Sequence, residues 1–195
     1  YAGISTANYN ALLVGWEGQT GVEKISEGNF PTDYPVVYGS GVWQTSVSGD
    51  TTWDISGGKA NKTPDAANSG LQEDSIIDSG ESYNVSFTVS NRTQGGITVY
   101  VGQGTQYVGN INSNASFSFN ITASFSDKLL LNATGSFDGS ISNVTVKKIT
   151  QLGVTTDFGS STYDAAPNAA GVAHDSLTAA IPTGYGWTIT DGGTA

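Results

Sequence analysis

Five short segments between Ser82 and Ile149 decide the fold: SYNVSFTVS (82–90), GGITVYVG (95–102), ASFSFNITAS (115–124), DKLLLNATG (127–135) and GSISNVTVKKI (139–149). In the first, apolar residues occupy every second position from Tyr83 to Val89, and polar residues lie between them. This alternation is the signature of a strand with one buried face. Short strands separated by Gly, Asn, Asp and Ser are typical of an antiparallel sandwich.

The last of these segments breaks the alternation, because Ile141 differs in parity from Val144 and Val146. One extra residue at Ser142-Asn143 would return the apolar side chains to one face, so we predict a β-bulge there. Upstream, residues 36–49 and 51–63 predict strands separated by glycine turns, and residues 71–77 predict another strand.

The two ends of the chain have a different character. Residues 5–20 predict a helix with Ser5 as N-cap and an apolar stripe at helical spacing, formed by Tyr9, Leu12, Leu13 and Trp16. Near the other end, residues 153–158 predict a strand, 164–180 a helix and 187–190 a last strand. The simplest architecture is a small α/β unit built from both ends, with the sandwich inserted in it.

The composition excludes several classes of function. The net charge is −10, so the surface would repel a nucleic-acid backbone. The chain has no cysteine, hence no disulfide or thiolate metal site, and no apolar run long enough to insert in a membrane. It also has no methionine, so Tyr1 cannot be an intact translation start. We expect the chain to be a processed product or a fragment.

No catalytic machinery is visible. The one histidine, His174, lies among Ala and Leu in a predicted helix, far in sequence from any serine nucleophile of the sandwich. Most carboxylates sit in Gly/Ser turns, where they cap the backbone. We therefore predict a non-enzymatic protein with no catalytic residues, no bound metal and no cofactor.

The stretch from about Glu27 to Ile149 resembles the jelly-roll, carbohydrate-binding-like modules of bacterial surface proteins and phage virion proteins. The matching residues are Gly28-Asn29-Phe30, Trp53 to Ala60, Gly80 with Tyr83 to Phe87, Phe137, and Gly139 to Val146. The family usually has Asp where Ser142 stands and a fuller Asn-Gly-Asp-Phe near the start, departures that weaken any inherited calcium site.

Both ends together resemble a unit of repeat-bearing bacterial surface proteins and phage structural proteins that ends in GWTITDGG. The matching pieces are Ser5 to Tyr9, Leu12 to Trp16, Ser161 to Tyr163 and Gly186 to Gly193. The fold class implied is mainly β: an antiparallel jelly-roll β-sandwich with a small α/β unit formed from both chain ends. The expected domains are residues 1–24 (terminal helix), 25–150 (sandwich) and 151–195 (strand, helix, strand).

Carbohydrate binding needs exposed flat aromatic rings beside polar groups, because a sugar ring has an apolar face edged by hydroxyls. Tyr100 has the outward parity in its strand, and we predict a site formed by Tyr100, Tyr107 and Trp43. Trp53 is expected to pack inside.

Seven Asn-x-Ser/Thr sequons are candidates for glycosylation: Asn61, Asn84, Asn91, Asn114, Asn120, Asn132 and Asn143. A strand whose outer face is made of Ser, Thr and Asn produces the same pattern without glycosylation, so both explanations stay open.

Two functions follow from the resemblances. The first is a structural protein on a virion surface, such as a phage head or tail decoration, associating with itself or with other virion proteins. The alternative is a carbohydrate-binding adhesion module of a secreted or cell-surface bacterial protein. Host glycans are expected partners in either case, whereas nucleic acid and membrane insertion are not.

Overall fold

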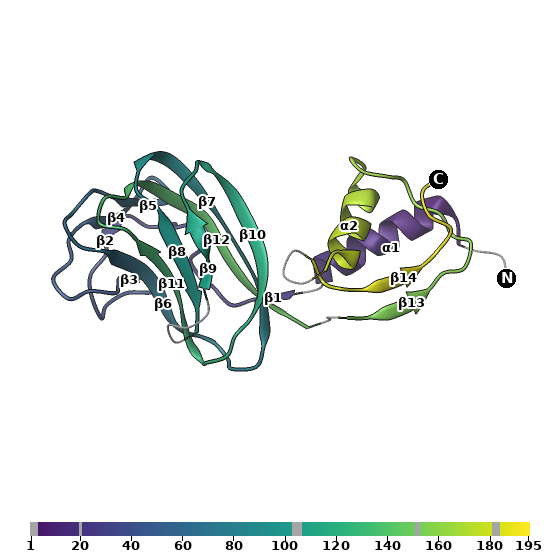
Figure 1. The fold of residues 1–195 in the computed structure, drawn as a ribbon, viewed down its shortest axis with the longest axis horizontal. Coiled ribbons are helices and arrows are strands. Elements are labelled where there is room, and N and C mark those ends of the chain that lie inside the picture. The colour runs from purple at the N-terminus through teal and green to yellow at the C-terminus, as the bar shows by residue number, and fades with distance from the viewer. Residues whose placement is uncertain (1–3, 20, 103–106, 151–152, 181–183) are drawn as a thin grey trace. The chain divides into compact units, whose positions relative to one another are not determined.

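The computed structural model describes residues 4–19, 21–102, 107–150, 153–180 and 184–195. The chain divides into two compact units (Figure 1). One comprises Tyr1–Val22 together with Ile149–Ala195, and the other comprises Glu23–Lys148. No helix among the described residues is long and apolar enough to cross a membrane.

The larger unit is an antiparallel β-sandwich, as the fold-class prediction states. Its seven-stranded sheet has the order β10-β7-β12-β5-β4-β2, with β1 also paired to β12. These strands are β1 (Gly21–Glu23), β2 (Tyr34–Pro35), β4 (Trp53–Ser56), β5 (Lys59–Lys62), β7 (Ser82–Gln94), β10 (Ala115–Thr122) and β12 (Asp138–Ile149).

The second sheet has five strands in the order β3-β6-β11-β8-β9, with β3 (Gln44–Thr45), β6 (Ser69–Ile77), β8 (Ile97–Val101), β9 (Tyr107–Ile111) and β11 (Asp127–Ala133). From β6 onward the chain changes sheet at nearly every connection, which is the crossing pattern of a jelly roll (Figure 1). The alternating apolar residues face inward and form one core.

The predicted bulge in β12 is confirmed. The pairing of β12 with β7 shifts register between Ser142 and Thr145, and Asn143 has a positive φ of 52°. Gly28 lies against this bulge: its carbonyl accepts the N–H of Val144 at 3.0 Å, and a Cβ at Gly28 would lie 1.8 Å from the Val144 oxygen. Only glycine permits so close an approach.

The prediction of strands across residues 36–49 is largely wrong. Within that stretch only β3 is a strand, accompanied by an isolated bridge between Val37 and Ser40. Three glycines with positive φ, Gly39, Gly41 and Gly49, divide the segment into turns. The strands expected in 51–63 and 71–77 are present as β4, β5 and β6.

The smaller unit contains α1 (Thr6–Gln19), α2 (Ala169–Thr178) and the parallel pair β13 (Thr155–Asp157) and β14 (Thr188–Thr190). All four predicted elements are confirmed, although α2 is shorter than expected: it begins after Asn168, whose side chain accepts the N–H of Ala170. The predicted apolar stripe of α1 lies in a separate core, with Tyr9 and Leu13 fully buried.

Candidate functional site

The outer face of the five-stranded sheet carries a row of residues that crosses all five strands. Gln44 of β3 lies opposite Gln72 of β6, which lies opposite Leu130 of β11. Leu130 lies opposite Tyr100 of β8, and Tyr100 lies opposite the register position of Tyr107 in β9. Neighbouring strands are about 4.8 Å apart, so the row spans about 19 Å, the length of an oligosaccharide rather than of one sugar ring.

A second, polar row runs beside the first, two residues away along β11 and β8 and three residues away along β9, where the register shifts. Asn132 of β11 lies opposite Thr98 of β8, and Thr98 lies opposite Asn110 of β9. Asn110 is exposed, and Thr98 and Asn132 are half-buried. No hydrogen bond joins any of these three side chains to another described residue, and each side chain is at least partly exposed.

The apolar part of the first row is set by Gly70, which lies opposite Asn132 on β6. A Cβ at Gly70 would lie 2.2 Å from Cδ1 of Leu130, so the missing side chain makes the space into which Leu130 leans. Tyr100 is half-buried beside Leu130. The sheet therefore presents an aliphatic and an aromatic side chain next to amide and hydroxyl groups.

The β3 end of the row is held by hydrogen bonds. Asp74 accepts from Nε2 of Gln72 at 3.0 Å and from Nε2 of Gln44. Oε1 of Gln44 accepts the N–H of Gly39 at 2.8 Å, which ties the loop containing Tyr38 to the row. Tyr38 is 57% exposed, the most exposed aromatic side chain among the described residues with assigned exposure.

The charged groups on this face have a local excess of negative charge. Lys128, on the same side of β11 as Leu130, lies 3.8 Å from Asp74 and 3.4 Å from Asp127. Two carboxylates thus surround one ammonium group. An anionic ligand would meet net repulsion here, whereas a neutral ligand would not.

The outer face of the seven-stranded sheet differs from this face in its hydrogen bonding. Its polar side chains bond to one another across strands, in the pairs Asn84–Asn120 (2.7 Å), Ser86–Thr145 (2.7 Å) and Thr88–Ser116 (2.9 Å). A shallow hollow lies among these groups, with Phe87 and Phe117 also in its lining, but a sugar that bonded to the polar groups would have to replace hydrogen bonds already made within the protein.

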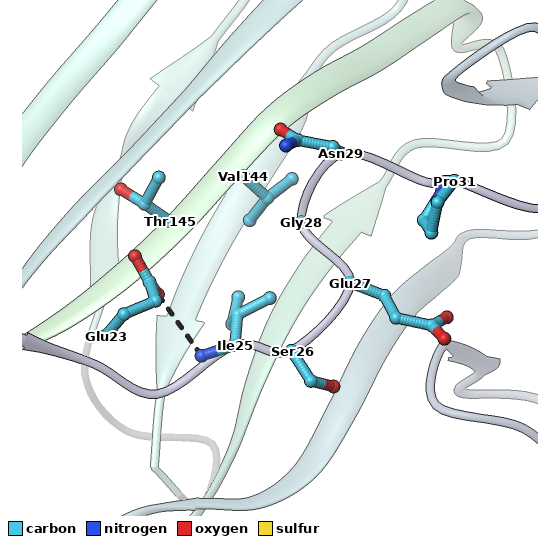
Figure 2. A pocket seen from close by; sticks show the side chains of 9 residues that line it. All are labelled: Glu23, Ile25, Ser26, Glu27, Gly28, Asn29, Pro31, Val144 and Thr145. Atoms are coloured by element: carbon cyan, nitrogen blue, oxygen red, sulfur yellow. Dashed lines mark hydrogen bonds between the residues drawn. The ribbon is translucent and has the colours of Figure 1, made fainter.

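A hollow of about 370 Å³ lies where the chain crosses the β12 bulge (Figure 2). Glu23 lines it, and its Oε1 accepts the N–H groups of Lys24 (3.2 Å), Ile25 (3.2 Å) and Val146 (2.8 Å). With three donors on one oxygen, this carboxylate holds the backbone together. The hollow is a structural feature of the bulge rather than a reaction site.

Glu73 is the one strongly perturbed carboxyl group among the described residues. It lies on the core side of β6, is 7% exposed, and its Oε2 has no partner among the described residues. Burial raises the pKa of Glu73 to about 7; the N–H of Ser26 opposes this shift, and the nearby charges of Glu27 and Glu23 add to it.

The smaller unit buries a polar cluster around Asp191. Its Oδ2 accepts the hydroxyl of Tyr9 at 2.7 Å and lies 3.6 Å from Nε2 of His174, while its Oδ1 accepts the N–H of Gly193. The imidazole of His174 stacks on the ring of Tyr163 with 4.2 Å between centroids. Burial, together with the hydrogen bond to Asp191, raises the pKa of Tyr9. Among the described residues, no serine, threonine or cysteine side chain is hydrogen-bonded to the imidazole of His174.

The sequence-predicted sugar-binding residues have different positions in the structure. Tyr100 and Tyr107 are opposite each other in register, although the side chain of Tyr107 is outside the described residues. Trp43 is fully buried, packs on Phe30 with 5.4 Å between ring centroids and donates from Nε1 to the carbonyl of Glu27. We correct its assignment, because a buried ring has no face open to a ligand. Trp53 is buried, as expected.

The seven sequons also differ in accessibility. Asn120 is 2% exposed, and Asn84 donates its amide to Asn120. Asn61 donates to Ser56, and Asn132 belongs to the polar row. The exposed sequons are Asn91, Asn114 and Asn143. Glycosylation therefore stays a prediction, most compatible with these three.

Sequence reasoning missed several residues of the two rows and their surroundings: Gln44, Gln72, Leu130, Thr98, Asn110, Asp74 and Tyr38. No group of three or more His, Cys, Asp or Glu side chains suited to a metal ion occurs among the described residues. Ser142, where the resembled family has Asp, is 8% exposed in β12.

No protein-family model matches the chain, and no curated protein matches it. Among solved structures it is similar to a CBM4 module (17% identity, 64% of this chain and 99% of that one, TM-score 0.49). It is also similar to the N-terminal cellulose-binding domain of Cellulomonas fimi β-1,4-glucanase C (19% identity, 66% of this chain and 98% of that one, TM-score 0.41). A third similar structure is the CBM22-1 xylan-binding domain of Paenibacillus barcinonensis Xyn10C (13% identity, 67% of this chain and 96% of that one, TM-score 0.41). Likeness at this level carries no argument about function, and the sandwich rests on the strand order described above.

Proposed function

We propose that the outer face of the five-stranded sheet binds a neutral, linear carbohydrate and does not alter it chemically. The observation that carries the proposal is the pair of adjacent rows, one containing Leu130 and Tyr100, the other Asn132, Thr98 and Asn110. A sugar chain lying across the strands would place its apolar ring faces on the first row and its hydroxyls against the second.

The test is isothermal titration of the full chain with cellotetraose, xylotetraose, laminaritetraose and an oligogalacturonate. We expect at least one neutral oligosaccharide to bind and the anionic one to bind more weakly. Tyr100→Ala should lower affinity about tenfold or more, equivalent to about 1.4 kcal/mol. Tyr100→Phe, which keeps the ring, should lower it much less.

The control is Asn84→Ala, which removes an amide from the opposite sheet. It should leave affinity unchanged, while Asn132→Ala should reduce it. Equal binding by the wild type and Tyr100→Ala, or a loss in Asn84→Ala equal to that in Asn132→Ala, would place binding elsewhere and contradict the proposal.

We infer that such a module acts outside the cell, as part of a cell-surface or secreted protein. The role on a virion surface expected from the sequence stays a prediction. Its test is co-purification of the chain with particles, in multiple copies.

A further inference from the structure

The outer edge of the seven-stranded sheet is formed by β10, whose sequence ASFSFNIT contains no charged residue, no proline and no glycine. Sheet edges recruit further strands unless they are short, charged, bulged or interrupted by proline. Three other sheet ends in the sandwich have such protection. β2 has two residues and ends in Pro35, β3 has two residues, and β9 has an irregular register near Gly109.

The core-facing side chains of β10 are incompletely covered. Phe117 and Phe119 pack against Phe87, with ring centroids 5.7 and 6.4 Å apart, yet both remain half-exposed. They lie on the last strand of the sheet, so no strand covers their outer side. Another strand added to β10 would bury more of both rings.

We propose that β10 pairs antiparallel with β10 of a second copy of this chain. The run Ser116-Phe117-Ser118-Phe119-Asn120 alternates polar and aromatic residues in the same way from either end. An antiparallel copy centred on Ser118 sets Phe117 opposite Phe119 and Ser118 opposite Ser118. A copy centred on Phe117 sets Phe117 opposite Phe117 and Ser116 opposite Ser118. This is the self-complementary contact that a two-fold dimer requires.

Charge does not oppose pairing at this edge. Two copies that each carry a net charge of −10 repel each other, and pairing succeeds best where no like charges are opposed. β10 provides eight consecutive residues without charge. The contact strip is narrower than a standard interface of about 1,600 Å², so the dimer is expected to be weak and dependent on concentration.

The first test is the mass of the full chain in solution, measured by analytical ultracentrifugation from about 10 μM to about 1 mM, where weak dimers form. We expect the mass to approach twice the monomer value. The Ser116→Lys/Ser118→Lys variant should stay monomeric, because it sets cations against cations at the edge. The matched control, Ser86→Lys/Thr88→Lys, adds the same charge to the same face one strand inward and should still dimerise.

The second test uses the absence of cysteine in the chain. A Ser116→Cys/Ser118→Cys variant should form a disulfide-linked dimer under mild oxidation, since either register opposes these positions across the two-fold axis. A Ser86→Cys/Thr88→Cys variant should not. A wild-type chain that is monomeric throughout the range, a dimer unaffected by the edge lysines, or equal cross-linking in both cysteine variants would overturn the proposal.

Discussion

Oε1 of Glu23 accepts the main-chain N–H of Val146 at 2.8 Å, and the carbonyl of Val146 in turn accepts the N–H of Lys24. A side-chain oxygen thus accepts the hydrogen bond that a main-chain carbonyl of a neighbouring strand accepts elsewhere in the sheet. It serves the part of β12 that immediately follows the bulge.

Replacing Glu23 by alanine should therefore destabilise the sandwich. The N–H groups of Lys24, Ile25 and Val146 lose their common acceptor, at an expected cost of about 1–3 kcal/mol. Urea denaturation measures the loss. Glu23→Gln retains an acceptor oxygen and should cost clearly less; equal effects of the two variants would show that Oε1 is not what matters.

A glycine-to-alanine change should have opposite signs at two positions. At Gly28 the new Cβ would collide with the main-chain oxygen of Val144, so we expect a loss at the upper end of overpacking effects, about 3 kcal/mol or more. At Gly15, inside α1 with no atom within 4 Å, alanine should add about 0.5–1 kcal/mol to the stability of the smaller unit. Thermal unfolding followed by tryptophan fluorescence measures both changes.

Stability of the sandwich should depend on pH through Glu73. Burial raises its pKa from 4.5 to about 7, so the folded protein favours the protonated form. Ionisation of Glu73 therefore costs folding free energy, fully above pH 7 and not at all below pH 4.5. As pH falls through 7, stability should rise, by an amount of the order of 3 kcal/mol over the whole window.

Glu73→Gln removes this titration. It should stabilise the protein above pH 7 and flatten the dependence of the unfolding free energy on pH between 5 and 8. Urea unfolding at several pH values measures both. Asp54→Asn, at an exposed position on β4, is the control. A Glu73→Gln curve parallel to that of the wild type would contradict the assignment.

The smaller unit should depend on the hydrogen bond between Tyr9 and Asp191. Tyr9→Phe keeps the buried ring and removes the donor to a carboxylate, at an expected cost of about 1.5–3 kcal/mol. Thermal unfolding of the smaller unit measures it. Asn8→Ala, at an exposed position of α1, should cost little.

The predicted domain boundaries have their own test. A chain containing only residues 25–150 should fold, because its 126 or so residues contain the whole sandwich core. Dispersed NMR amide signals and a cooperative urea transition would support this. The fragment lacks Glu23, so it should be less stable than the same sandwich in the full chain.

The sequence predicted most of the strands because a one-sided strand must alternate. The parity break between Ile141 and Val144 even located the bulge, since only one extra residue can restore a common face. The prediction of strands failed across residues 36–49, where the apolar residues Val36, Val42 and Trp43 pack in loops and do not belong to paired strands. In that stretch the buried residues do not recur at a regular spacing, so the sequence pattern cannot identify them.

The candidate site was only partly predictable for a related reason. Parity identifies Tyr100 as outward-facing, but it cannot say which residues lie opposite it on strands distant in sequence. Gln72 and Glu73 are both buried although they lie on opposite faces of β6, so no alternation marks either. The row from Gln44 to Tyr100 exists only once the register is known.

The construction of the smaller unit from both ends of the chain has a mechanical consequence. α1 and the residue that follows β14 are joined by the Tyr9–Asp191 hydrogen bond, which spans 182 residues of sequence. A tensile force transmitted along the backbone through these two segments would act first on the contacts within the smaller unit. The sandwich lies between these two segments in sequence. Its backbone would therefore bear tension only after the contacts of the smaller unit had broken, and its outer face would keep its shape until then.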